Sequence, residues 1–138
     1  MIANDDFLVD VTRFPVVLIT LSHMPALTSF APHFAAIKAL AQARGPLYVV
    51  NDARSTVAGE FSSHHRKLAA SEYDLFRTQC PGCVLAEAYV LSSAVARGVL
   101  TAVRWLAPPP WPTRTFSSLP DALTWAVDCQ RCAPRLVP

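Results

Sequence analysis

The chain contains one nearly continuous apolar run, PLYVVND at residues 46–52, and this run decides the fold. Such a run is typical of a strand buried on both faces of a parallel sheet. Before it, over residues 28–45, apolar residues recur at helical spacing: Phe30, Phe34, Ile37 and Ala41. The Gly45-Pro46 pair predicts that this helix ends immediately before the strand.

The alternation of strands and helices extends outward in both directions. Two β-branched runs, residues 7–12 and 16–22, predict neighbouring strands before the first helix. The later pattern predicts a helix at 64–79, a strand at 83–92, a helix at 93–107, a short strand at 113–118 and a helix from 119. The order β-β-α-β-α-β-α-β-α predicts an α/β fold with a mostly parallel, mixed five-stranded sheet and four helices. We expect one domain over residues 1–132 and a flexible C-terminal tail over 133–138.

Apolar stripes on the two middle helices predict which side chains face the core: Leu68, Leu75 and Phe76 on one, and Val95, Val99, Ala102, Val103 and Leu106 on the other. Arg97 and Arg104 lie on the opposite side of the second of these helices and are candidate interface residues. The chain's three tryptophans are expected to pack around the PPPWP link at residues 108–112, and an exposed Trp111 would anchor an interface.

Four stretches carry a resemblance to a known family: FPVVLITLS (14–22), GPLYVVNDAR (45–54), LSSAVARGVLTAVRWLAPPPWPTRTFSS (91–118) and LPDALTWA (119–126). Together with the element order, they resemble the SpoIIAA-like or STAS family. The chain looks closest to the small bacterial branch described as STAS/SEC14-type domains. The resemblance covers roughly Phe7 to Val127, and its motifs are structural, so they indicate a fold more than an activity.

This resemblance implies a non-catalytic regulatory domain that binds a protein partner, either a second copy of itself or another bacterial regulatory protein. It also implies candidate phosphoacceptors at Ser62 and Ser63, since signalling STAS domains carry a serine at this helix start. The alternative interpretation is that one of these serines is only the N-cap of the helix. The SEC14 side of the resemblance implies a carrier of small apolar ligands, in which Phe30, Phe34, Tyr89 and the tryptophans would line the pocket.

Two CxxC pairs, CPGC at residues 80–83 and CQRC at 129–132, have metal-ligand spacing. Both follow predicted helices, so parallel topology places them at one edge of the sheet, where Cys80, Cys83, Cys129 and Cys132 could bind a structural zinc ion in an adaptor protein. CPGC precedes a strand and not a helix, which argues against a thioredoxin-type redox centre. The remaining interpretation is separate structural thiols.

Charge and composition argue against several function classes. Twelve Lys and Arg against ten Asp and Glu give a net charge of +2, so nucleic acid is not an expected partner. The most apolar region, residues 84–107, is interrupted by Glu87, Arg97 and Arg104 and does not predict a membrane span. The acidic start MIANDDFLVD does not resemble a signal peptide, which predicts a cytoplasmic protein with reduced thiols.

No assembled catalytic motif is present in the sequence. The four glycines are far apart, so the glycine-rich nucleotide motifs and the nucleophile elbow are missing. The histidines, at positions 23, 33, 64 and 65, have no metal-site spacing and are expected to be exposed or capping. The sequence therefore predicts a binding protein without a cofactor and not an enzyme.

Overall fold

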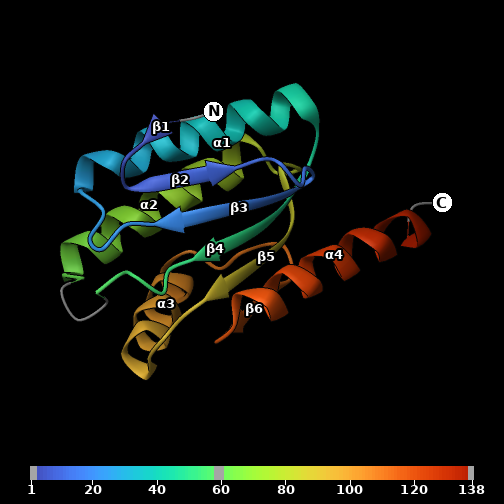
Figure 1. The fold of residues 1–138 in the computed structure, drawn as a ribbon. Helices are drawn as coiled ribbons and strands as arrows, with labels where there is room; N and C mark the ends of the chain where they lie inside the picture. Colours follow the sequence, from blue (N-terminus) through green and yellow to red (C-terminus); the bar gives the residue numbers. More distant parts are fainter. Residues whose placement is uncertain (1–2, 58–60, 137–138) are drawn as a thin grey trace.

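A computed structural model describes residues 3–57 and 61–136, which form a six-stranded sheet with helices on both faces (Figure 1). The strands are β1 (Ala3–Asn4), β2 (Phe7–Asp10), β3 (Val16–Leu21), β4 (Leu47–Asp52), β5 (Val84–Val90) and β6 (Thr113–Phe116). The helices are the short 3-10 helix η1 (Leu27–Ser29), α1 (Phe30–Arg44), α2 (Ser63–Gln79), α3 (Ala94–Leu106) and α4 (Leu119–Leu136). The predicted fold class and element order are confirmed, and β1 and η1 are short additions to them.

The strands lie in the sheet in the same order as in the chain, from β1 to β6. β1, β2 and β3 pair antiparallel, whereas β3, β4, β5 and β6 pair parallel. Right-handed crossovers that always step toward the same edge bring every connecting helix to the same face. The helices α1, α2 and α3 therefore cover one face, and α4, which connects to no further strand, folds back over the other (Figure 1).

The central strand β4 explains why two cores form. All six of its residues are buried, and successive side chains point to opposite faces of the sheet. Leu47 and Val49 belong to the core beneath α1 and α2, while Tyr48 and Val50 belong to the core beneath α4. The apolar run that predicted a doubly covered strand is thus a strand with helices on both sides.

Helix ends follow the local signals in the sequence. Gly45 caps the C-terminus of α1 with φ 104°, a conformation that side-chain-bearing residues rarely adopt. Ser62 and Ser93 cap the N-termini of α2 and α3, each accepting a hydrogen bond from a backbone N–H three residues later. The helix α4 extends to Leu136, into the stretch 133–138 that was predicted to be a flexible tail; residues 137–138 lie outside the described residues.

Two of the predicted apolar stripes were partly wrong. Leu75 on α2 is exposed, whereas Ala70 and Tyr73 face the core. Val95 and Leu106 on α3 are also exposed, because α3 packs through Ala96. Within the described part of the chain, the structure contains no helix of sufficient length and apolar character to cross a membrane.

Candidate functional site

A cavity of about 160 Å³ lies between the sheet and the helices α1, α2 and α3. Its walls are mainly aromatic and aliphatic, with representative lining residues from each covering helix: Phe30, Phe34 and Ile37 from α1, Phe76 from α2, and Val99 and Val103 from α3. A concave, largely apolar space with a few polar groups is the usual form of a small-molecule site. This cavity is therefore the candidate functional site.

Small side chains explain why the core does not close here. Ala53 follows β4, Ala69 lies on α2 and Ala96 lies on α3, and all three line the cavity. Ala96 is the buried contact by which α3 packs, next to Ala53 and Leu91. Because a protein interior normally fills to crystal-like density, alanines at facing positions leave space that larger aliphatic residues would occupy.

A buried carboxylate forms part of the cavity wall. Glu87 lies in the middle of β5 and is only 6 % exposed. Its Oε2 accepts a hydrogen bond from Asn51 Nδ2 at 2.8 Å, and its Oε1 accepts from the Tyr73 hydroxyl at 2.6 Å and from Trp111 Nε1 at 3.1 Å. A buried charge is costly unless it is hydrogen-bonded, and three donors supply that compensation.

Burial and the Glu87 carboxylate raise the pKa values of two neighbouring tyrosines. Burial and the negative charge of Glu87 raise the pKa of Tyr73 far above its usual value. The same two causes, with burial the larger, raise the pKa of Tyr89 well above its usual value. Both hydroxyls therefore stay protonated near neutral pH, where they act as hydrogen-bond donors and not as general bases.

His33 on α1 contributes a further polar group to the cavity wall. It is 5 % exposed and its ring stacks on Phe7, with 4.0 Å between ring centroids and an interplanar angle of 12°. Burial lowers the pKa of His33 to about 4, so the imidazole is neutral near pH 7. Among the described residues, no group forms a hydrogen bond with its Nδ1 atom, although this atom is fully buried. The prediction of exposed or capping histidines is wrong for His33.

The serine pair lies at the start of α2, as predicted. The Ser62 Oγ accepts from the backbone N–H of His65 at 3.2 Å and lies 2.8 Å from His65 Nδ1. Ser63 is the first residue of the helix and is exposed. The N-cap interpretation is confirmed for Ser62, and phosphorylation of either serine stays a prediction.

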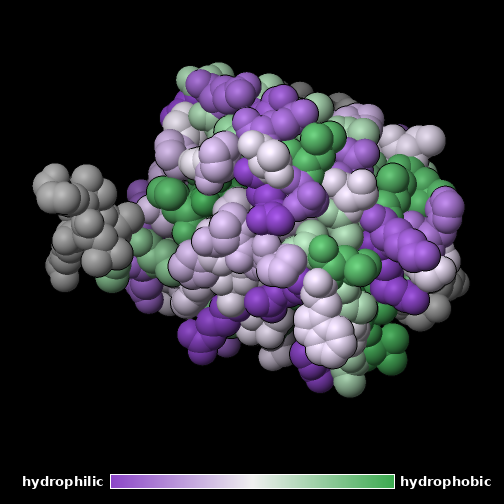
Figure 2. Space-filling model, turned by 180° about the vertical axis from the view of Figure 1, so that it is seen from behind, coloured by the Kyte–Doolittle hydropathy of each residue, from purple (hydrophilic) through white to green (hydrophobic). Residues whose placement is uncertain are grey.

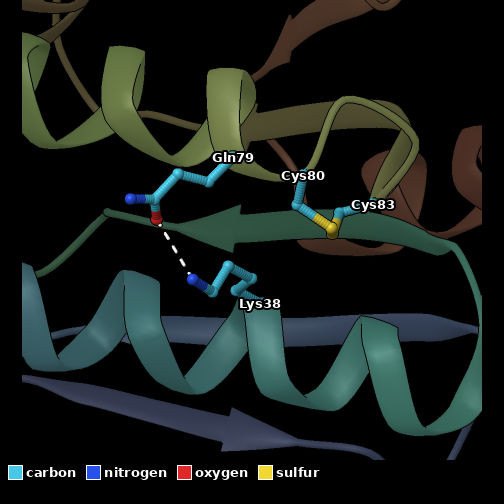
Figure 3. The surroundings of a disulfide bond; sticks show 4 residues. All are labelled: Lys38, Gln79, Cys80 and Cys83. Atoms are coloured by element: carbon cyan, nitrogen blue, oxygen red, sulfur yellow. Dashed lines mark hydrogen bonds between the residues drawn. A yellow bond between two sulfur atoms is a disulfide. The ribbon is translucent and has the colours of Figure 1, made fainter.

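The structure separates the two CxxC pairs. Cys80 and Cys83 form a disulfide across the turn between α2 and β5, with their Cα atoms 5.4 Å apart, so the expectation of reduced thiols is not met at this pair (Figure 3). Both pack in the core beneath α1 and α2, whereas Cys129 lies on α4 and packs against the core on the opposite face, and Cys132 is exposed. The described residues contain no cluster of three or more His, Cys, Asp or Glu suited to a metal ion, so the four-cysteine zinc site is not formed.

The Cys129 thiol is not activated as a nucleophile. Burial, the neighbouring Cys132 and the charge of Asp128 all raise the pKa of the Cys129 thiol. A raised pKa keeps the thiol protonated and lowers its nucleophilicity at neutral pH. The raised pKa therefore argues against Cys129 as a nucleophile.

The candidate interface residues divide between surface and core. Arg97 on α3 is exposed and Arg104 is half-buried, as expected for a polar helix side. Trp111, suggested as an exposed anchor, is instead 7 % exposed and bonds to Glu87. The exposed tryptophan is Trp105, at 82 %. On the face of the molecule in Figure 2, hydrophobic and hydrophilic residues lie side by side.

Comparison of the chain with protein-family models, with curated proteins and with solved structures finds no match. The resemblance to STAS domains therefore stays a prediction made from the sequence. The inference about function depends on the geometry of the cavity and of the α3 surface.

Sequence reasoning missed the polar residues of the cavity. Glu87 was read only as an interruption of an apolar region, although a carboxylate in the middle of a buried strand requires a compensating set of donors. That requirement is a signal that could have pointed to Asn51 on the neighbouring buried strand. No comparable signal identifies His33, whose burial depends on how α1 packs against β2.

Proposed function

We propose that this protein binds and holds a small, mainly apolar molecule in the cavity between the sheet and α1–α3. The observation that carries the proposal is the size of the cavity, about 160 Å³, together with its apolar walls. An engineered apolar cavity of about 150 Å³ in another protein binds benzene, so a space of this size suits a ligand of one small ring. The proposal is one of binding without turnover.

The lining residues support this proposal over the other interpretations. Phe30, Phe34 and Tyr89, named from the SEC14 side of the family resemblance, all line the cavity. The three tryptophans are not among the residues that line it, and Trp111 takes part only indirectly through its bond to Glu87. Aromatic walls match the ligand class that the carrier alternative implies.

The direct test uses toluene as the probe, with binding measured by calorimetry and by ligand-observed NMR. We expect the wild-type chain to bind toluene and to release it chemically unchanged. The variant Ala96→Leu places a larger side chain on the α3 wall of the cavity, so we expect it to abolish binding while keeping the fold. Ala94→Leu is the matched control, because Ala94 lies exposed on the same helix and does not line the cavity.

Two results would count against the carrier proposal. One is a wild-type chain that binds neither toluene nor other one-ring probes. The other is equal toluene affinity in Ala96→Leu and Ala94→Leu, which would place any binding outside the cavity. Circular dichroism of each variant confirms that it is folded before its affinity is compared.

A second candidate function is binding of a protein partner through α3, as the STAS resemblance implies. The specific observation is that α3 exposes three large apolar side chains, those of Val95, Trp105 and Leu106. The helix also carries Arg97 and Arg104 and no acidic residue. Charge complementarity therefore favours a partner that presents apolar and acidic side chains together.

A fluorescently labelled amphipathic peptide of leucine and glutamate tests this second candidate by anisotropy. We expect Trp105→Ser to weaken binding at least tenfold, since exposed aromatic anchors dominate such interfaces, and Arg97→Glu to weaken it by repulsion. Leu8→Ser is the control, because it removes another exposed apolar side chain, from β2. Equal affinity in all three variants, or no binding by the wild-type chain, would contradict an acidic partner at α3.

A further inference from the structure

We infer that the free edge of β6 binds an extended acidic segment of another protein, which joins the sheet as an additional strand. The residues of this edge belong neither to the cavity nor to α3, so the inference goes beyond both proposed functions. β6 is the last strand of the sheet, and among the described residues no strand pairs with its outer side (Figure 1).

The pairing with β5 shows which backbone groups of β6 are free. The carbonyl oxygens of Pro112 and Phe116 each accept a hydrogen bond from a backbone N–H of β5 or the residue after it, at 2.9 Å. Since the backbone groups of successive strand residues point to opposite sides, Arg114 also faces β5, whereas Thr113 and Thr115 face away. Each of these threonines therefore directs one N–H and one C=O to the open edge.

This edge is accessible and long enough for another chain to pair with. Arg114 and Thr115 are exposed, and Thr113 is half-buried. The opposite edge strand, β1, has only two residues, and such shortness is one way in which proteins protect a sheet edge. β6 has four residues, and its unpaired N–H and C=O groups form a template for one more strand.

The charge around β6 favours an acidic segment. Residues 88–120 contain three arginines, Arg97, Arg104 and Arg114, and no aspartate or glutamate. Arg114 lies within β6 itself, where its guanidinium carbon is 5.1 Å from the ring centroid of Phe116. Because side chains directly opposite one another on adjacent strands interact, Arg114 would stabilise a strand that places an aspartate or glutamate opposite it.

The same arginine disfavours a second copy of this chain as the added strand. Antiparallel pairing of two copies over the full length of β6, about a two-fold axis, brings the two Arg114 side chains directly opposite one another. Like charges in opposite positions destabilise a strand pair, and charged side chains on edge strands commonly prevent edge-to-edge association. An acidic partner is therefore favoured over self-association.

The test uses a fluorescently labelled peptide of alternating threonine and glutamate, with binding measured by anisotropy. Two further versions of this peptide carry backbone N-methyl groups, one on all threonines and the other on all glutamates. An added strand presents only every second N–H to β6. We therefore expect one methylated version to lose affinity at least about fivefold and the other to bind like the unmodified peptide.

Variants of β6 locate the binding on the protein. Thr115→Pro removes the outward N–H without removing a hydrogen bond to β5, so we expect the peptide affinity to fall at least about fivefold. Thr115→Ala is the matched control, because it keeps the N–H, and we expect a change of less than about twofold. Arg114→Glu should weaken binding about tenfold by repulsion, whereas Arg97→Glu makes the same charge change on α3 and should have little effect on this peptide.

Three results would overturn the inference. The first is a wild-type chain that does not bind the unmodified peptide. The second is equal affinity of the two methylated peptides, or of Thr115→Pro and Thr115→Ala, which would place the peptide on another surface. The third is a wild-type dimer in sedimentation that Thr115→Pro lacks, which would assign the edge to a second copy.

Two controls keep these results interpretable. Circular dichroism shows whether Thr115→Pro is folded, and if it is not, the two methylated peptides decide the outcome. Toluene binding in the cavity does not depend on β6, so it should be unchanged in all the folded variants, and the carrier proposal is tested independently.

Discussion

The carboxylate of Glu87 on β5 receives hydrogen bonds from three separate parts of the chain: β4, α2 and the segment before β6. Each donor is itself buried, so the carboxylate adds side-chain hydrogen bonds between these elements inside the core. Removing the carboxylate would leave three buried donors without an acceptor, and this is more costly than the loss of the bonds themselves. Glu87 therefore has a structural role beside its place in the cavity wall.

A second single residue, His33, makes the stability of the fold depend on pH. Its pKa is about 4 in the folded chain and 6.5 as the ordinary value. Above pH 6.5 both states are neutral at this residue, so its contribution is fully present. As the pH falls from 6.5 to 4, the unfolded chain takes up the proton and the folded chain does not, which lowers the unfolding free energy by up to about 3 kcal/mol.

Urea unfolding of wild-type and His33→Phe at pH 7, 5.5 and 4.5 measures this effect. We expect the wild-type chain to lose stability over this range and the variant to lose clearly less. Carboxylates such as Asp6 and Asp52, whose pKa values hydrogen bonding lowers from 3.8, keep their contribution until lower pH and do not interfere in this window. Parallel loss of stability in the two proteins would show that His33 is not buried as described.

Among the elements, the turn between α2 and β5 is closed by the Cys80–Cys83 disulfide, while Cys129 and Cys132 on α4 are free. We expect iodoacetamide, without reductant, to label only the free pair, with Cys132 faster because it is exposed and the pKa of Cys129 is raised. Mass spectrometry after reduction and unfolding should then show four labelled cysteines. Labelling of all four in the untreated folded chain would contradict the disulfide.

The disulfide in this turn also contributes to the unfolding free energy. Because the disulfide closes a loop of only four residues, its reduction should lower the unfolding free energy by no more than about 2 kcal/mol. A hydrogen bond from α1 also holds the end of α2 next to this turn: Lys38 Nζ donates to Gln79 Oε1 at 3.1 Å (Figure 3). Reduced and oxidised protein should therefore both be folded, which unfolding curves with and without reductant would check.

The elements themselves could be predicted well from the sequence, because their signals are local. The apolar run at β4, the Gly45-Pro46 stop and the serine before α2 each act within a few residues. Which side of a helix faces the core was predicted less well, as Leu75 and Val95 show. A stripe of apolar residues is compatible with more than one rotation of the helix, and only packing against the sheet selects one.

The candidate site could be predicted only in part for the same reason. Phe30, Phe34 and Tyr89, expected from the family resemblance to line a pocket, do line the cavity, whereas the tryptophans expected with them do not. The unpaired Nδ1 of His33 and the donors around Glu87 depend on contacts between residues far apart in the chain. The cavity itself results from alanines on three different segments, and no single segment indicates it.

For the whole molecule, the order of strands in the sheet is the order of synthesis. Each new strand can therefore dock on the one before it while the rest of the chain is still being made, and no strand has to insert between two others. The exception is the face beneath α4. Its residues Val16, Val50, Ala88 and Val90 stay uncovered until α4 packs on them. Until Ala122 and Ala126 leave the ribosome, this face is an exposed hydrophobic sheet, so the nascent chain is most prone to aggregation after β6 has emerged and before α4 has.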